Sequence, residues 1–279
     1  MTIERIYIPT VKRADRQITY ENLPKSLQEK VVMVIDGSEL NQYKYDCDYL
    51  ELPEHIVGSW TQLAETRKFI HEQAGFIKYA MIDDDLIIKR RNSKYWTGVS
   101  NMESSRRNAT SEEIEGAFET FSKWLDEDDI GIVGLSSIEA PPPSTEYIDT
   151  VGVFNILCID GKKLSRELPD MNITSIRVAE DVLFIYECLS HGINTRQSTE
   201  WTYENGSLRK DMQNTRVVWN EMIEEVPEDY FQTDEHYDAL EYIRRKFPAG
   251  IKIYEKGGKR KNTKYWKRIY KPRQTNSLF

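Results

Sequence analysis

The sequence contains little cysteine and no long apolar run. Its three cysteines, Cys47, Cys158 and Cys188, are widely spaced and form no Cys-x-x-Cys or Cys/His pattern. We therefore expect reduced, buried thiols rather than a disulfide framework or a zinc site. No stretch approaches the roughly 20 apolar residues that a membrane-spanning helix needs, and the first residues lack the basic and apolar segments of a signal peptide. These absences predict a cytoplasmic protein.

Several motifs of well-known enzyme classes are also absent. The chain has no Gly-x4-Gly-Lys-Ser/Thr loop, no Gly-x-Gly-x-x-Gly turn, no His-Glu-x-x-His and no Gly-x-Ser-x-Gly. These absences count against P-loop and Rossmann-type nucleotide enzymes, zinc peptidases and α/β-hydrolases.

The composition is that of a folded protein with an uneven charge. Of 279 residues, 39% are hydrophobic and 30% are charged, which is typical of one large domain, or of one domain with an appendage. We expect a main domain over 1–215 and a helical appendage over 216–279 that ends in a basic tail. Residues 252–273 contain ten Lys/Arg and the single acid Glu255, so this segment has a net charge of +9. Because the net charge of the whole chain is −8, the other residues together carry −17.

Aromatic residues are interleaved with the basic ones in 252–273. They are Tyr254, Tyr265, Trp266 and Tyr270. Because aromatic rings can stack on bases while lysine and arginine contact phosphates, the segment predicts a nucleic-acid partner. A solvated tail without a partner is the alternative.

Short β-rich segments and amphipathic helices alternate in the first part of the chain. Strands are expected at 5–10, 31–36, 49–53 and 77–83. Ser59 and Gln62 have the spacing of a capping box and predict a helix from there to about Ala74. Since apolar strands joined by a helix belong to a sheet covered on both faces, we expect an α/β fold with a mostly parallel twisted sheet flanked by helices.

The later segments continue this pattern. Thr110 and Glu113 form another capping box, which predicts a helix start. Residues 89–108 show no periodicity and place Tyr95 and Trp96 among basic residues, so we expect a long loop that contacts a ligand or is disordered. Further expected elements are a strand at 131–137, a strand at 151–160 ending in an Asp-Gly turn, and a helix at 177–192.

Three consecutive carboxylates, Asp83, Asp84 and Asp85, follow the fourth expected strand. In an extended chain alternate side chains share a side, so Asp83 and Asp85 would project together and Asp84 away from them. Mg²⁺ and Mn²⁺ bind one or two carboxylates and complete their coordination with water and phosphate oxygens. The cluster therefore predicts a divalent-metal site, with a solvated turn as the alternative.

The surrounding segments resemble a known family. The stretches IPTVKRADRQITYENLP, AMIDDDLIIKRR, GIVGLSS and AEDVLFIYECLSHG occur in this order, and Arg67 lies in the helix before the acidic cluster. In this the sequence resembles glycosyltransferases of the GT-A type, where an Asp-x-Asp motif binds the divalent ion of a nucleotide-sugar donor. More narrowly, it resembles the TET-associated glycosyltransferases, which are linked with viral, including bacteriophage, DNA hypermodification. The resemblance covers roughly residues 5–200.

The resemblance implies a donor site and its residues. The donor would be a nucleotide sugar, a UDP-sugar in the first instance, with Mn²⁺ or Mg²⁺ held by Asp83 and Asp85. The resemblance also implies that the main domain binds the nucleotide sugar and carries out catalysis. If the protein is viral, the implied location is the host-cell cytoplasm. The residues it places near the donor are Thr10, Arg13, Arg16, Asp36, Arg67 and, in a supporting role, Asp84.

The resemblance also implies an acceptor side. Glu180 and Asp181 match an acidic pair at a helix start that faces the acceptor, where either carboxylate could act as general base. Acids are in any case favoured in a first helical turn by the macrodipole. The leading hypothesis is sugar transfer to a hydroxyl on double-stranded DNA of the 5-hydroxymethylcytosine type, with 252–273 and 89–108 contacting the DNA. The alternatives are transfer to a polysaccharide or lipid-linked glycan, and a catalytically silent DNA-binding module.

Overall fold

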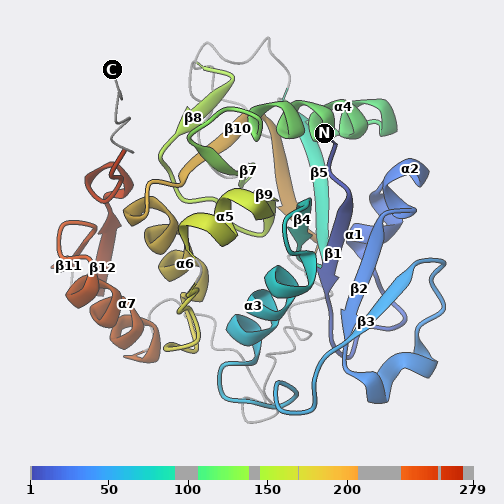
Figure 1. Ribbon diagram of the computed structural model, residues 1–279, viewed down its shortest axis with the longest axis horizontal. Helices are drawn as coiled ribbons and strands as arrows, with labels where there is room; N and C mark the ends of the chain where they lie inside the picture. The colour runs from blue at the N-terminus through green and yellow to red at the C-terminus, as the bar shows by residue number, and fades with distance from the viewer. Residues whose placement is uncertain are drawn as a thin grey trace.

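The fold is built on one large sheet (Figure 1). The computed structural model describes residues 2–91, 106–137, 145–168, 170–206, 234–256 and 259–272. Within these residues the sheet has ten strands, in the order β3-β2-β1-β4-β9-β7-β10-β5-β6, with β8 paired to β10. No helix among the described residues is long and apolar enough to cross a membrane.

The first four strands form a parallel group at one side of the sheet. They are β1 (Arg5–Pro9), β2 (Val31–Ile35), β3 (Asp48–Glu51) and β4 (Lys78–Ile82). The others are β5 (Leu86–Arg91), β6 (Arg106–Asn108), β7 (Ile130–Ser137), β8 (Tyr147–Asp149), β9 (Ile156–Asp160) and β10 (Asn194–Asn205). Because β9 is antiparallel to both β4 and β7, and β10 is parallel to β7, the strands β7 and β10 point the same way as β1 to β4. The expected α/β fold is confirmed.

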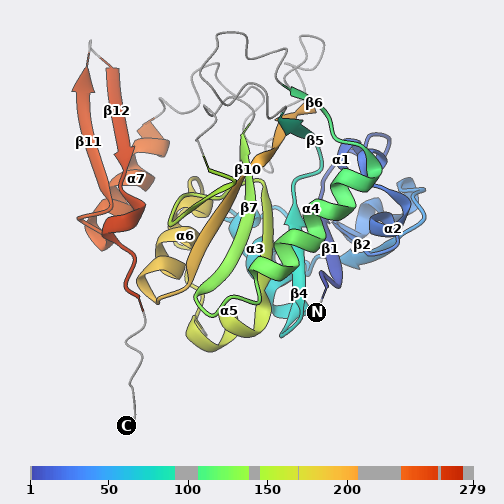
Figure 2. The ribbon, with the colours of Figure 1, turned by 90° about the horizontal axis from the view of Figure 1, so that it is seen from above.

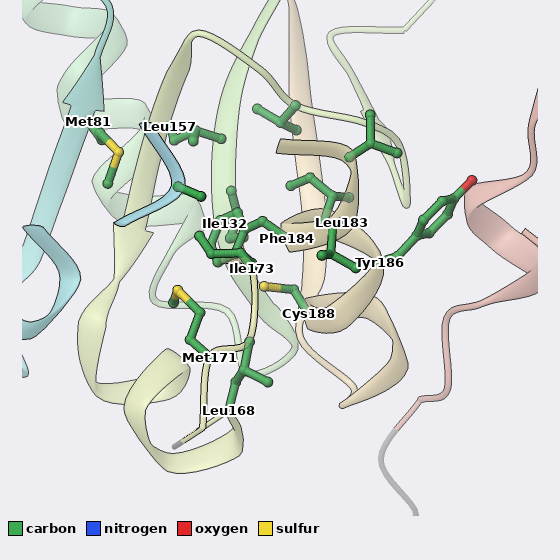
Figure 3. Packing of buried hydrophobic residues seen from close by; sticks show 14 of the residues in the cluster. Met81, Ile132, Leu157, Leu168, Met171, Ile173, Leu183, Phe184, Tyr186 and Cys188 are labelled. Carbon is green, nitrogen blue, oxygen red and sulfur yellow. The ribbon is translucent and has the colours of Figure 1, made fainter. Parts of the chain in front are cut away.

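Helices cover both faces of the sheet. They are α1 (Ile18–Asn22), α2 (Lys25–Gln28), α3 (Gln62–Ala74), α4 (Ser111–Trp124), α5 (Gly161–Glu167) and α6 (Glu180–Ser190), with the 3₁₀ turn η1 (Gly37–Gln42). One core cluster packs α1, α2 and α4 against one face. The other packs α3, α5 and α6 against the opposite face, and Figure 3 shows part of it. Neighbouring residues of β1 alternate between the clusters, as a pleated strand buried on both faces requires.

Local signals succeeded at one helix start and failed at another. The capping box of Thr110 and Glu113 is confirmed at the start of α4. The box expected at Ser59 is wrong, because α3 begins only at Gln62. The Ser59 hydroxyl donates to the carboxylate of Glu65, and the Gln62 side chain accepts a hydrogen bond from the Gly58 amide at 2.8 Å. The helix therefore starts one residue after Thr61, with no side-chain cap.

One expected turn, and the two ends of one expected loop, are in fact parts of regular elements. The Asp160 carboxylate accepts a hydrogen bond from the Lys163 amide at 3.0 Å and caps α5, so no Asp-Gly turn follows β9. The ends of the expected 89–108 loop pair with each other as β5 and β6. The remainder of that loop, with Tyr95 and Trp96, lies outside the described residues.

The expected basic tail is a folded unit. Helix α7 (Asp234–Lys246) is followed by the hairpin of β11 (Ile251–Lys256) and β12 (Lys259–Lys264) and the short turn η7 (Trp266–Arg268). This C-terminal unit, residues 234–256 and 259–272, lies beside α6 in both views (Figures 1 and 2). Apolar residues of α7 and β11 belong to the same core cluster as α6. The boundary expected near residue 215 falls outside the described residues and stays a prediction.

Candidate active site

The predicted site residues gather at one edge of the sheet. Thr10 directly follows β1, Asp36 follows β2 and Asp83 follows β4. Because these strands are parallel, their carboxyl ends meet at the same edge, where ligands of open α/β sheets bind. Helices α3 and α6 both begin at this edge, since each runs back to the opposite edge before the next parallel strand.

Asp84 anchors two loops to each other. Its carboxylate is buried and accepts hydrogen bonds from Thr10 Oγ1 at 2.7 Å and from Arg13 Nη1 at 2.5 Å. The side-chain amide of Gln17 donates in turn to Thr10 Oγ1 at 2.8 Å. Burial raises the pKa of Asp84, while Arg13 and the Thr10 hydroxyl act to lower it. Thr10, Arg13 and Asp84, expected near the donor, therefore form one network.

Arg67 connects the acidic cluster to α6. Its Nη2 lies 3.6 Å from Asp83 Oδ1, and its Nε lies 3.3 Å from Glu180 Oε1. Burial raises the pKa of Asp83 to about 7, with Asp85, Asp84 and Asp181 adding to the rise and Arg67 opposing it. Burial, followed by the charge of Asp181, likewise raises the pKa of Glu180 to about 7. One guanidinium thus serves the buried carboxylate of Glu180 and the partly exposed carboxylate of Asp83, and leaves both short of positive charge.

The three aspartates lie in a turn rather than along a strand. Strand β4 ends at Ile82, and Asp84 and Asp85 occupy the turn before β5, so the alternation assumed for an extended chain does not govern them. The turn is held by Thr19, whose hydroxyl donates to the Asp83 carbonyl at 2.5 Å, and by the Gly206 amide, which donates to the Asp85 carbonyl at 2.6 Å.

A divalent ion, which the family resemblance implies, fits the donor set left in this turn. Both oxygens of Asp84 are occupied by Thr10 and Arg13. Within the described part of the chain, Asp83 and Asp85 have ion pairs only at 3.6 Å, so their oxygens remain available. Among the described residues no group of three acidic, histidine or cysteine side chains could enclose a metal. Asp83 and Asp85 would therefore hold the ion together with water and donor phosphate, as is usual for Mg²⁺.

An open cavity of about 500 Å³ adjoins the Asp84 network. It lies between the loop after β1 and η1. Its lining residues are Lys12, Ala14, Asp15, Ser38, Glu39 and Gln42. Asp36 caps η1 by accepting a hydrogen bond from the Ser38 amide at 2.9 Å, and so shapes the cavity without lining it. Arg16 is exposed, and its amide donates to the Arg13 carbonyl at 3.1 Å.

Two buried polar residues of this region were not anticipated. Glu39 accepts a hydrogen bond from the Lys12 amide at 2.8 Å, and Gln17 supports Thr10. The spacing of Asp36 and Glu39, which is that of a helix cap and its third residue, was the available signal for Glu39. Gln17 carries no such signal, because its role depends on a residue seven positions away.

Glu180 and Asp181 differ in their surroundings although they are adjacent. They follow Ala179, which has a left-handed φ of 59°. Glu180 is 5% exposed and faces Arg67, whereas Asp181 is partly exposed and accepts a hydrogen bond from the Val182 amide at 2.7 Å. A favourable interaction with the helix dipole alone would not require Glu180 to be buried.

Comparison with known proteins gives one family match and several distant structural similarities. A family model described as TET-Associated Glycosyltransferase matches residues 4–166. TarS 1–349 of S. aureus is 14% identical with a TM-score of 0.42 over 73% of this chain and 59% of that chain. Apo GlyE of Streptococcus pneumoniae TIGR4 is 14% identical with a TM-score of 0.37, over 70% of this chain and 45% of that one. UTP-bound UGPase of Acinetobacter baumannii is 9% identical with a TM-score of 0.38, over 73% of this chain and 88% of that chain.

The chain thus spans 59% and 45% of the TarS and GlyE chains it resembles, and no curated protein matches it. The matched residues 4–166 form more than half of the chain and run from β1 to α5. They include the Asp84 network, Arg67 and the acidic turn, while Glu180 and the C-terminal unit lie beyond the match. The predicted family is therefore confirmed, and the chain belongs to the TET-associated glycosyltransferases.

Proposed function

We propose that this protein transfers a sugar from a nucleotide-diphosphate donor, a UDP-sugar in the first instance, to a hydroxyl on DNA of the 5-hydroxymethylcytosine type. The observation that carries the proposal is the pair of arginine–carboxylate networks at the carboxyl edge, which leave Asp83 and Asp85 available beside Glu180. Family membership supports a glycosyltransferase.

The donor side is supported by the cavity and the Asp84 network. The cavity is open and lined largely by polar residues beside the loop after β1, which suits a nucleoside. Arg13, fixed by Asp84, provides positive charge next to the acidic turn. A divalent ion on Asp83 and Asp85 would neutralise the charge of the departing nucleoside diphosphate.

The acceptor side is supported by Glu180 and Asp181 across Arg67 from the acidic turn. In the transfer the acceptor oxygen forms a bond to the anomeric carbon. The bond from that carbon to the donor phosphate oxygen breaks, and the nucleoside diphosphate leaves with the electron pair. The acceptor proton passes to a carboxylate of this pair, and a pKa of Glu180 near 7 is suited to accepting a proton at neutral pH.

The outer face of the hairpin supports DNA as the acceptor. Cross-strand pairing puts Lys252, Tyr254, Lys256 and Lys261 on the face opposite the buried Ile251, and all four are exposed. Positive charge with an exposed ring suits a phosphate backbone with accessible bases.

Other parts of the expected DNA contact are already engaged within the protein. The ring centroids of Trp266 and Tyr186 lie 4.5 Å apart, so the Trp266 ring packs within the protein and is not available for stacking on a base. At the start of the 89–108 segment, Lys89 pairs with Glu204 at 2.7 Å and Arg90 pairs with Glu113 and Glu200. The outer face of the hairpin is therefore the better-supported contact.

The test incubates the full chain with Mn²⁺, a panel of labelled nucleotide sugars, and duplex DNA with or without 5-hydroxymethylcytosine. We expect label only on the hydroxymethylated duplex. Label on a polysaccharide or lipid-linked glycan instead would refute the DNA acceptor. DNA binding without transfer from any donor would indicate a catalytically silent module.

A further inference from the structure

Trp60 presents a largely uncovered aromatic ring at the carboxyl edge of the sheet. It lies in the segment that leads into α3, and it is 62% exposed. Trp60 belongs to neither of the two core clusters that the described residues form. A single exposed apolar side chain needs no explanation by itself, so the significance of Trp60 depends on what holds it and on what lies beside it.

The backbone on both sides of Trp60 is fixed. The Gly58 amide donates to the side chain of Gln62 at 2.8 Å, and the Ser59 amide donates to the Ile56 carbonyl at 3.0 Å. Both Ile56 and Gln62 are buried. Because its segment is anchored to the core in this way, the ring is held in place before any ligand binds, which lowers the entropic cost of binding.

Arg177 covers one face of the ring. Its guanidinium carbon lies over the Trp60 ring, 4.6 Å from the centroid. The Nη1 of the same guanidinium lies 3.4 Å from Glu235 Oε1 in the first turn of α7. The Arg177 side chain is only 13% exposed, so the cation is fixed between the ring and the C-terminal unit. The rest of the indole remains open to solvent.

The ring lies beside the acidic pair at the start of α6. Helices α3 and α6 both begin at the lower end of the fold in Figure 1. They are joined within the site by Arg67 and Glu180, whose Nε and Oε1 atoms lie 3.3 Å apart. Trp60 precedes Arg67 in the chain, and Arg177 precedes Glu180. The contact between Trp60 and Arg177 therefore lies farther out, at the rim of the same site.

We propose that Trp60 is a stacking platform for the acceptor base, a pyrimidine that has left the DNA stack. An aromatic ring can stack on any base, but only an unstacked base has a free face to offer. Arg177 connects this ring through Glu235 to the C-terminal unit, whose outer hairpin face is basic and suits the phosphates of the same DNA. The inference rests on the proposed function and adds to it a residue that holds the acceptor.

The binding test compares Trp60→Ala with Trp60→Phe in the full chain. The ligand is a duplex with 5-hydroxymethylcytosine opposite an abasic site, because an unpaired base leaves the stack more easily. We expect Trp60→Ala to weaken binding about 5- to 150-fold, the effect of losing one stacked base. The slope of log K against log salt should not change, because no phosphate contact is lost. Trp60→Phe keeps a ring and should recover most of the affinity.

The matched control is Phe76→Ala. Phe76 is 75% exposed and follows the end of α3, at the opposite edge of the sheet, so this variant should bind DNA as wild type does. Thermal denaturation should show all three variants folded, since both rings are exposed. Unchanged affinity in Trp60→Ala, equal loss in Trp60→Ala and Trp60→Phe, or a reduced salt slope would each overturn the stacking role.

Tryptophan emission tests whether the platform takes a base or a sugar ring. A short single-stranded oligonucleotide should quench the emission of wild type more than that of Trp60→Phe, and a neutral oligosaccharide should affect the two equally. The reverse pattern would overturn the base as the occupant. Quenching by the oligonucleotide in a protein that transfers no sugar would support the platform and refute the proposed function. Transfer to DNA by Trp60→Ala with the wild-type KM would refute the platform alone.

Discussion

Replacing Arg67 by methionine tests how the acidic site is held together. The substitution removes a cation that lies near both Asp83 and Glu180, at 3.6 and 3.3 Å, and keeps an unbranched apolar side chain of similar length. Removing one partner of a buried ion pair costs about 3–5 kcal/mol, because a buried charge is left without compensation. Both carboxylates can become neutral by taking up a proton, since the pKa of each is raised to about 7. We therefore expect a loss of stability at the lower end of this range, about 3 kcal/mol.

A loss of about 3 kcal/mol corresponds to a fall in Tm of about 6–12 °C for a chain of this size. The assay is thermal denaturation by circular dichroism at pH 7.5. The matched control is Lys68→Met on the same helix, because Lys68 is 43% exposed in its side chain and reaches Glu72 only at 4.0 Å. Such a surface pair contributes at most about 1 kcal/mol. If Arg67→Met and Lys68→Met lowered Tm equally, Arg67 would not be compensating the two carboxylates.

Three further predictions follow from described contacts. Asp83→Asn and Asp85→Asn should each lower transfer at least about 100-fold and weaken Mn²⁺ binding measured by calorimetry; unchanged Mn²⁺ affinity in both would refute the metal assignment. His71 is buried, and its pKa is lowered to about 4. Because the unfolded chain takes up this proton at a higher pH than the folded chain, the contribution of His71 to the free energy of unfolding should fall by about 3 kcal/mol from pH 6.5 to pH 4. Asp83 and Glu180, whose pKa values are raised, act in the opposite direction over this range; urea denaturation should therefore show the His71 contribution as the difference between wild type and His71→Gln. The last prediction concerns exposed lysines on the outer face of the hairpin, namely Lys252, Lys256 and Lys261. Replacing all three by glutamine should weaken DNA binding and reduce the slope of log K against log salt by about 3; an unchanged slope would exclude this face as the contact.

The sequence predicted most of the sheet and the family because these depend on local signals. The strand before the acidic cluster, expected at 77–83, is β4 at Lys78–Ile82, since a short apolar run between polar residues is sufficient to predict it. The capping box at Thr110 succeeded for the same reason. At Ser59 the same pattern failed, because Glu65 lies within reach of the serine hydroxyl and competes for it.

The parts of the site that the sequence did not reveal depend on contacts between distant segments. The engagement of Asp84 by Thr10 requires residues 74 positions apart in the chain to meet, so no local pattern distinguishes Asp84 from its neighbours. The basic residues of 252–264 look uniform in sequence. Only the pairing of β11 with β12 assigns Lys264 to the inward face of the hairpin and its neighbours to the outer one.

The double engagement of Asp84 also has a thermodynamic consequence. Thr10 and Arg13, in the loop beside the cavity, are tied through one carboxylate to the turn that carries Asp83 and Asp85. A nucleotide that orders this loop therefore also orders the turn, and an ion held by the turn restrains the loop. Linkage requires such an effect to be reciprocal, so each ligand should raise the affinity for the other by the same factor. Donor and metal are then expected to bind cooperatively, each being a weak ligand alone.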